Sequence, residues 1–439
     1  MGGVFYMERT ERSWKALYFS LPIFSWALFD FASTIFSSNI TTIFFPFYLQ
    51  ETVGTSEQLN QISSTWISYA NALGSLLLVL FSPLYGVSID RTGRKKRPIF
   101  IFMVFTTLLT AGMGLFASWE TGRELFALPV TLLLVILCFV FAKFTFQSSQ
   151  VFYDSMISDL GEKKEIPLIS GFGVAVGYMG TLVGLSVYLY VGDGDFSKAF
   201  IPTAILFFVF SLPILFWSKE KKKEVVEKKP FFSGYKEIAT TIQDMRKYRS
   251  IFLFMIAYFF LNDAIATTIA MMAVYAKAIV GFTTSQFILL YLVSTVSSII
   301  GAFVFGFIAK AKGPKVSVRI VAYLLIVALS IGTFAVEEWM FWIAGSLFGV
   351  ALGSTWVTSR AYIVELTPEA KRGQFFGLFA FSGKVSSIVG PVLYGSITWA
   401  LADYGNIASR TALGSLIVLT VLGLIFLERI REDESTMSD

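Results

Sequence analysis

Four charged side chains stand inside otherwise apolar stretches of this 439-residue chain, and they are the residues best placed to do chemistry. They are two acids, Asp30 and Asp263, and two bases, Lys143 and Lys384. Each lies roughly 13 to 20 Å from the predicted end of its helix, near the middle of a hydrocarbon layer about 30 Å thick. Charges at that depth are usually functional, so we expect them to bind a polar solute, to carry a coupling ion or to pair between helices.

Two of these charges belong to polar faces on their predicted helices. The first face comprises Lys143, Gln147, Gln150 and Asp154, and the second comprises Asp30, Ser33, Thr34, Ser37 and Thr41. Their spacing places each set on one side of a helix. A polar face inside a membrane must turn toward protein or water, so both faces should line a cavity or an interface. Tyr178 and Asn262 could line the same cavity, and packing between helices would explain them as well.

The elements that position these residues are apolar helices. Hydrophobic residues make up 55% of the chain and charged residues 15%, whereas soluble domains carry about 25% charged residues. Continuous apolar runs of about 18 or more residues predict an all-α membrane protein rather than a barrel. We predict twelve transmembrane helices, at residues 21–50, 63–89, 98–118, 126–154, 167–191, 199–217, 250–280, 285–309, 316–336, 339–366, 373–401 and 407–427.

These helices divide into two bundles of six. Residues 1–217 form the first half, 218–249 a basic linker and 250–439 the second half. Most of the 35 lysines and arginines fall on one side of the membrane when the helices alternate, which places the linker and both termini in the cytoplasm. The same rule explains the net charge of +5, so we expect membrane lipids beside the linker and no nucleic-acid partner. For a bacterial source the membrane would be the cell membrane, and the N-terminus does not show the pattern of a cleaved signal peptide.

The composition also argues against several chemistries. The chain has no histidine and one cysteine, Cys138, which lies in an apolar run. Neither a disulfide nor a cysteine or histidine metal site is therefore expected. We find no nucleotide-binding loop and no nucleophile beside a base. The sequence predicts a protein that is not an enzyme and that needs no metal or cofactor.

The two halves resemble each other, which indicates a duplication. At an offset of 206 residues, segment 154–184 aligns without gaps with 360–390, and three glycine pairs coincide: Gly171 and Gly377, Gly177 and Gly383, and Gly184 and Gly390. At an offset of 220, Gly86 and Gly93 align with Gly306 and Gly313. The first and seventh helices also share an early aspartate, Asp30 and Asp263. Two parallel halves with a site between them are the plan of transporters that work by alternating access.

A motif stands at the turn between the second and third helices. It reads Gly86-x-x-x-Asp90-Arg91-x-Gly93-Arg94-Lys95 and resembles the loop signature of the major facilitator superfamily. Segments 26–36, 170–180 and 375–391 further resemble the branch that includes the fungal autophagy-linked vacuolar amino-acid effluxer and many bacterial proteins. The branch usually has Asp-Trp-Ala-Asn in its first helix, where this chain has Asp30-Phe-Ala-Ser.

The resemblance implies that this turn is a gate. We expect Asp90 to lie near the positive N-terminal end of the eleventh helix, around Gly373 and Gln374. Gly86 and Gly93 would allow close packing and a tight turn.

The basic residues of the turn should have two roles. We expect Arg91 or Arg94 to pair with Asp159 or Glu365 across the gate. The three cations that follow should only set the topology; they are Lys95, Lys96 and Arg97. In the second copy Lys310 replaces the acid, so one gate of this kind should operate.

The superfamily fold places helices 1, 4, 7 and 10 around a central cavity, with helix 11 alongside. We therefore predict that the buried charges pair within each half, Asp30 with Lys143 and Asp263 with Lys384. Such pairs could line the cavity or only staple helices together. Arg360 lies near the end of its span, where it could snorkel to the surface, and is left out of the predicted site.

Together these features predict a secondary active transporter of a small polar or zwitterionic solute. An amino acid would suit a site with both signs of charge, and export of amino acids is what the branch resemblance implies. Proton coupling is a hypothesis that rests on the two midplane aspartates. The alternatives are export of amphipathic drugs, suggested by 46 Phe and 9 Trp, and a receptor or scaffold that transports nothing.

Overall fold

The computed structural model describes residues 12–53, 57–119, 122–125, 128–191, 195–220, 229–243, 247–404 and 406–430. Within these residues twelve helices are long and apolar enough to cross a membrane. The predicted all-helical fold with twelve spans is thus confirmed.

The elements follow one another along the chain as follows. They are α1 (Trp14–Tyr18), α2 (Leu21–Phe36), a π-helix (Ser37–Phe44), α3 (Phe45–Val53), α4 (Glu57–Thr92), α5 (Lys96–Ala117), β1 (Glu124–Leu125), β2 (Leu128–Pro129), α6 (Val130–Leu160), α7 (Ile166–Val191), α8 (Phe200–Ser211), α9 (Pro213–Trp217), α10 (Gly234–Gln243), α11 (Arg249–Val280), α12 (Thr284–Lys312), α13 (Pro314–Phe334), α14 (Glu338–Leu366), α15 (Arg372–Ala400) and α16 (Asn406–Glu428), with short 3-10 turns at Phe196–Ala199, Phe231–Ser233, Glu369–Lys371 and Ala402–Tyr404.

Local sequence explains why several spans begin and end where they do. Gly93 takes a φ of 65° between α4 and α5, and Gly313 a φ of 85° between α12 and α13; glycine reaches these values without the clash that a Cβ would cause. Pro314 then occupies the first turn of α13, where its missing N–H leaves no bond unmade. At the start of α12, Thr283 and Gln286 form a capping box.

The first span differs from the single helix predicted over residues 21–50. Its middle is a π-helix, Ser37–Phe44, a wider turn often found at functional positions. Within it Asn39 is fully buried and donates to the carbonyl of Gly184 at 2.9 Å and to Thr203 at 3.1 Å. The local widening therefore accompanies a polar contact between this span and two neighbouring helices.

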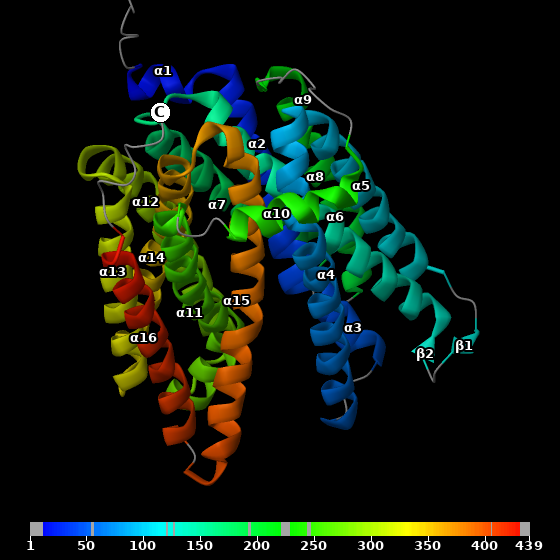
Figure 1. Ribbon diagram of the computed structural model, residues 1–439. Coiled ribbons are helices and arrows are strands. Elements are labelled where there is room, and N and C mark those ends of the chain that lie inside the picture. Colours follow the sequence, from blue (N-terminus) through cyan, green and yellow to red (C-terminus); the bar gives the residue numbers. More distant parts are fainter. Residues whose placement is uncertain are drawn as a thin grey trace, which may run out of the picture.

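The helices form two bundles that converge at one end and diverge at the other (Figure 1). The end where they converge carries α1, α9 and α10 (Figure 1). It also carries residues 91–97, the turn with five cations, and we call it the basic end.

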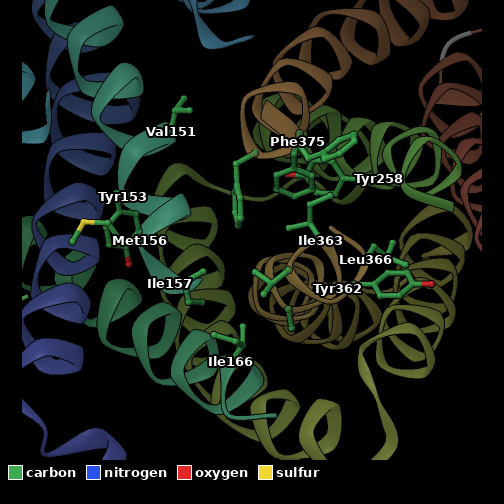
Figure 2. Packing of buried hydrophobic residues seen from close by; sticks show 14 of the residues in the cluster. Val151, Tyr153, Met156, Ile157, Ile166, Tyr258, Tyr362, Ile363, Leu366 and Phe375 are labelled. Carbon is green, nitrogen blue, oxygen red and sulfur yellow. The ribbon is translucent and has the colours of Figure 1, made fainter. Parts of the chain in front are cut away.

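Three large clusters of buried apolar side chains show how the bundles touch. One cluster draws on both bundles, and Figure 2 shows part of it, with Met156 and Ile157 of α6 on one side and Ile363 of α14 on the other. A second cluster belongs to helices before residue 218, and a third to helices after residue 249. The bundles therefore share an apolar core at the basic end and keep separate cores toward the other end.

Helix α10 in the linker was not predicted, and it lies across the basic end. Tyr235 donates to the carbonyl of Leu80 on α4 at 2.6 Å. Thr241 donates to Gln374 on α15 at 2.8 Å. The linker thus contacts both bundles at once.

Candidate functional site

A buried arginine joins the two bundles at the centre of the molecule. Arg360 on α14 lies with Nη2 2.9 Å from Asp154 Oδ1 on α6, and with Nη1 3.5 Å from Asp30 Oδ2 on α2. Its side chain is 8% exposed, and those of Asp30 and Asp154 are 11% and 22% exposed. Because charges buried in pairs interact strongly, this cluster ties α14 to both α2 and α6.

Two aromatic rings hold the arginine in place. Trp26 and Tyr153 stack with their centroids 4.7 Å apart, and the Trp26 indole donates to the Tyr153 carbonyl at 3.1 Å. The Arg360 guanidinium lies 5.8 Å from the first ring and 5.5 Å from the second. Cation–π attraction at these distances adds to the ion pairs. Arg360, Asp30, Asp154 and these two rings form what we call the central site. The sequence analysis placed Asp30 and Asp154 on polar faces but left Arg360 out.

The predicted pair of Asp30 with Lys143 is wrong, because Asp30 forms its ion pair with Arg360. Lys143 is buried on α6 and donates instead to Asn71 on α4. The predicted pair of Asp263 with Lys384 is also wrong. Lys384 on α15 lies within electrostatic range of Asp154 and of Lys143, so it belongs to the central site.

Asp263 and Asn262 bind α15 rather than the central cations. Asp263 accepts a hydrogen bond from the backbone N–H of Gly390 at 2.7 Å. Asn262 donates to the carbonyl of Gly383 and to Ser386, both at 2.8 Å. These contacts hold α11 against α15 in the second bundle.

The other predicted lining residues lie close to the central site. Gln150 donates to Ser33 on α2 at 2.7 Å. Gln147 is buried, and its Oε1 has no hydrogen-bond partner among the described residues. Tyr178 on α7 packs against the same apolar cluster as Trp356 on α14 and is within electrostatic range of Asp30 and Arg360. The polar faces predicted from spacing therefore turn toward this centre.

The structure corrects the match between Asp30 and Asp263. A Cβ added to Gly177 would lie 3.0 Å from Asp30, and a Cβ added to its repeat partner Gly383 would lie 3.1 Å from Tyr258. Tyr258 thus stands where Asp30 stands, at an offset of 228 residues (258 minus 30). Asp263 lies five residues further on (263 minus 258), more than a helical turn away.

The gate aspartate lies where the sequence predicted it. Asp90 Oδ1 accepts from the backbone N–H of Gly373 at 2.7 Å, and Oδ2 accepts from that of Gln374 at 2.8 Å. Both donors are at the start of α15, where N–H groups lack helical partners and the dipole favours a negative charge. Asp90 therefore locks α4 to α15 at the basic end.

The predicted roles of the gate cations are partly wrong. Arg91 pairs with Glu237 of the linker helix at 2.8 Å, and not with Asp159 or Glu365. Asp159 pairs instead with Lys95, which is buried, at 2.6 Å.

Lys95 therefore does more than set the topology, whereas Arg94 is exposed. Burial lowers the pKa of the Lys95 ammonium, and the Asp159 carboxylate opposes that shift. Lys95 and Asp159 also line a small cavity of about 80 Å³ between the turn and α15, together with Asp90 and Arg372.

Two close helix crossings complete the contact at the basic end. A Cβ added to Gly377 on α15 would lie 3.2 Å from the Cα of Gly86 on α4. A Cβ added to Gly171 on α7 would lie 2.9 Å from the Cα of Gly306 on α12. The second crossing repeats the first, because Gly171 aligns with Gly377 and Gly86 with Gly306. Glycines that the repeat placed in equivalent positions thus make equivalent contacts.

The same repeat contained a signal for the missed arginine. Asp154 and Arg360 differ by the offset of 206 that aligns the halves (360 minus 154). Equivalent residues of two related halves can touch only near the axis that relates them. Opposite charges at equivalent positions therefore indicated an ion pair at the centre of the molecule.

Comparisons with known proteins agree with this architecture. The family model described as "Vacuole effluxer Atg22 like" matches residues 22–438. An uncharacterised MFS-type transporter, YxiO of Bacillus subtilis, is 26% identical over 94% of this chain and 95% of its own length. Autophagy-related protein 22-1 of Aspergillus niger is 24% identical over 62% of this chain. The match covers 49% of the length of that fungal relative.

Solved structures share the fold at low identity. A bacterial homologue of the iron transporter ferroportin, crystallised in an outward-facing state, has a TM-score of 0.71 and 13% identity, and covers 93% of this chain and 99% of its own. The human organic anion transporter MFSD10 has a TM-score of 0.71 and 12% identity over 95% of this chain and 100% of its own. The chain is a multi-pass membrane transporter that belongs to the Atg22-like vacuole effluxer family, a branch of the major facilitator superfamily.

Proposed function

We propose that this transporter moves a small zwitterionic solute, of which an amino acid is the simplest example, by alternating access. The halves 1–217 and 250–439 would rock about the central site. The observation that carries the proposal is the mixed-charge cluster of Arg360 with Asp30 and Asp154. It joins the bundles at the point where a solute must pass from one side to the other.

The cluster supplies both partners that a zwitterion needs. A carboxylate could replace the acids on Arg360 in a bidentate contact, with Lys384 nearby as a second cation. An ammonium could then take the acid that Arg360 releases. A solute with both charges would compensate both sides of the broken ion pair, whereas a solute with one charge would leave a buried partner alone.

The direction of opening follows from where the bundles touch. We propose that the basic end faces the cytoplasm, with both termini and the linker on that side, as the excess of basic residues favours. The lock at Asp90 and the two glycine crossings then close the cytoplasmic side, so this conformation opens outward. The name of the family supports efflux as the direction of transport. As the driving force we propose a proton gradient.

The test is thermal stabilisation of the purified protein by matched solutes. Leucine, leucinamide and 4-methylpentanoate share the same isobutyl side chain. Leucine carries both charges, leucinamide only the positive charge and 4-methylpentanoate only the negative charge. A ligand that binds the folded state raises the melting temperature by mass action. We expect the zwitterion to stabilise most within each matched set drawn from a panel of amino acids.

Two variants make this test specific. Arg360→Gln should abolish the shift, whereas Arg319→Gln, which removes a half-buried arginine paired with Glu428, should keep it. Stabilisation by amphipathic cations alone would overturn the proposal in favour of drug export. A solute that stabilises Arg360→Gln as well as the wild type would show that the cluster is not the binding site.

A further inference from the structure

Asp263 is a buried acid that forms no ion pair with the described cations. None of its surface is exposed, and its one hydrogen bond among the described residues joins Oδ1 to the backbone N–H of Gly390. Its Oδ2 has no hydrogen-bond partner, and the described part of the chain offers it no ion pair. Asp30 and Asp154 differ in this respect, since both lie against Arg360.

A second unpartnered oxygen lies beside it. Thr267 is fully buried, and its Oγ1 also has no hydrogen-bond partner in the part of the chain that the structure describes. Asp263 and Thr267 stand at i and i+4 on α11, on one face of the helix. Both flank the same point of α15, because a Cβ added to Gly390 would collide with Thr267 Oγ1 and with Asp263 Oδ1.

The described charged and titratable side chains of the neighbouring helices form no hydrogen bond or ion pair with Asp263. In the middle of the bundle they are Arg360 on α14, Lys384 and Tyr394 on α15, Arg410 on α16, Tyr291 on α12 and, on α11 itself, Tyr258. Arg360 holds the central acids, and Lys384 is within range of Asp154. Arg410 donates to the carbonyls of Thr333 and Ala335, both at 2.7 Å. None of these described groups forms an ion pair with Asp263.

A carboxylate in this position would be a buried charge without compensation, which proteins avoid by changing its protonation state. A protonated carboxyl is neutral, so protonation removes the uncompensated charge from this buried position. We propose that Asp263 is a proton-binding site of the second bundle, occupied in this conformation and separate from the ionised acids on Arg360. The role of this proton in driving transport rests on the proposed function.

The position of Asp263 connects the proton to the gate. The backbone that it binds, at Gly390, belongs to the same helix whose first residues bind Asp90. Gln374 and Gly390 are 16 residues apart (390 minus 374), or about 24 Å along α15. Release of the proton would leave an uncompensated charge buried between α11 and α15, which favours an arrangement that lets water reach it. Protonation therefore favours the arrangement in which α15 closes the basic end.

Infrared spectroscopy of the purified protein tests this assignment without any substrate. A protonated carboxyl has a C=O stretching band that a carboxylate lacks. We expect the wild type to show such a band at neutral pH, and expect the band to shift when the aspartates carry ¹³C. Asp263→Asn, which keeps the acceptor for Gly390, should lose the band. Thr267→Val should shift it, because an apolar group replaces the polar group beside the carboxyl, and Asp30→Asn should retain it.

Three results would overturn the assignment. The first is a wild type without the band at neutral pH, and the second is a band that persists in Asp263→Asn. The third is a band that appears only when choline replaces sodium in the buffer, because the site would then hold a metal cation. If no solute stabilises the protein, the proposed function fails and the infrared result is unaffected.

Discussion

The lock at Asp90 gives the sharpest prediction, because one side chain holds two backbone donors. Asp90→Asn preserves the shape of the side chain but removes its charge, and the new amide group faces an N–H that needs an acceptor. Each of the two hydrogen bonds, at 2.7 and 2.8 Å, joins a neutral donor to a charged acceptor, and such bonds contribute about 1.5 kcal/mol. The pair therefore stabilises the closed basic end by roughly 3 kcal/mol.

A loss of this size changes the balance between conformations. Each 1.4 kcal/mol is a factor of about ten in an equilibrium, so the closed basic end should lose up to roughly 100-fold in population relative to open forms. The chain has a single cysteine, Cys138, which can be replaced by alanine. A cysteine placed at Ser155, which is 2% exposed beside the gate cavity, then reports opening through its rate of labelling by a water-soluble maleimide.

We expect Asp90→Asn to raise the labelling rate of Ser155→Cys by more than tenfold. Glu369→Gln is the matched control, because it removes another acid from the same cavity. The Glu369 side chain is 76% exposed, and its ion pair, 3.7 Å long, is with Arg372, three residues away in the chain. The control should label like the parent. Equal rates in Asp90→Asn and Glu369→Gln would refute the reasoning that Asp90 closes this end.

Two further predictions concern the same end of the molecule. Gly171→Ala should also raise the labelling rate, because the added Cβ would lie 2.8 Å from the carbonyl oxygen of Ala302 and push α7 from α12; Gly395→Ala, whose Cβ meets nothing within 4 Å, should not. Lys95→Met should lower the thermal stability, since loss of one partner of a buried pair costs about 3 to 5 kcal/mol. The double variant with Asp159→Leu should recover most of that loss in a melting experiment, and an unrecovered double variant would count against the pair.

The spans and the gate acid were predictable because their signals are local. Long apolar runs identify membrane helices whatever the rest of the chain does. Asp90 stands in a motif whose glycines and charge are contiguous, and a helix start in the other half was its natural partner. Both predictions needed no knowledge of how the bundles pack.

The partners of the buried bases were not predictable in this way. We excluded Arg360 because it lies near the end of its span, where a lone helix would let it reach water. In the folded molecule the basic end is packed, so the same position is 8% exposed and faces two acids. Distance to a helix end measures exposure only when no other helix covers that end.

The sequence also could not show which cation of the basic turn points into the protein. Arg91 ends α4 near the linker helix, and Lys95 precedes α5 with its side chain turned toward α6. Their directions depend on the sharp turn at Gly93. Consecutive charges carry no periodicity that would rank them, so spacing could not distinguish them. Arg91, which we had expected to pair with Asp159 or Glu365, pairs instead with Glu237 on the unpredicted helix α10.

The gate combines a symmetric contact with an asymmetric charge. Both glycine crossings use equivalent residues, so the steric part of the closure comes from the duplication itself. The charge does not repeat, because Lys310 stands where Asp90 stands, and an ammonium cannot accept a hydrogen bond from a helix N-terminus. The crossing of α4 with α15 therefore has an acid bound to a helix N-terminus, a contact that Lys310 cannot make at the equivalent position of the crossing of α7 with α12. Helix α15 also binds Asp263. A proton on Asp263 can therefore influence the crossing of α4 with α15, and protonation would control one of the two crossings of the duplicated fold.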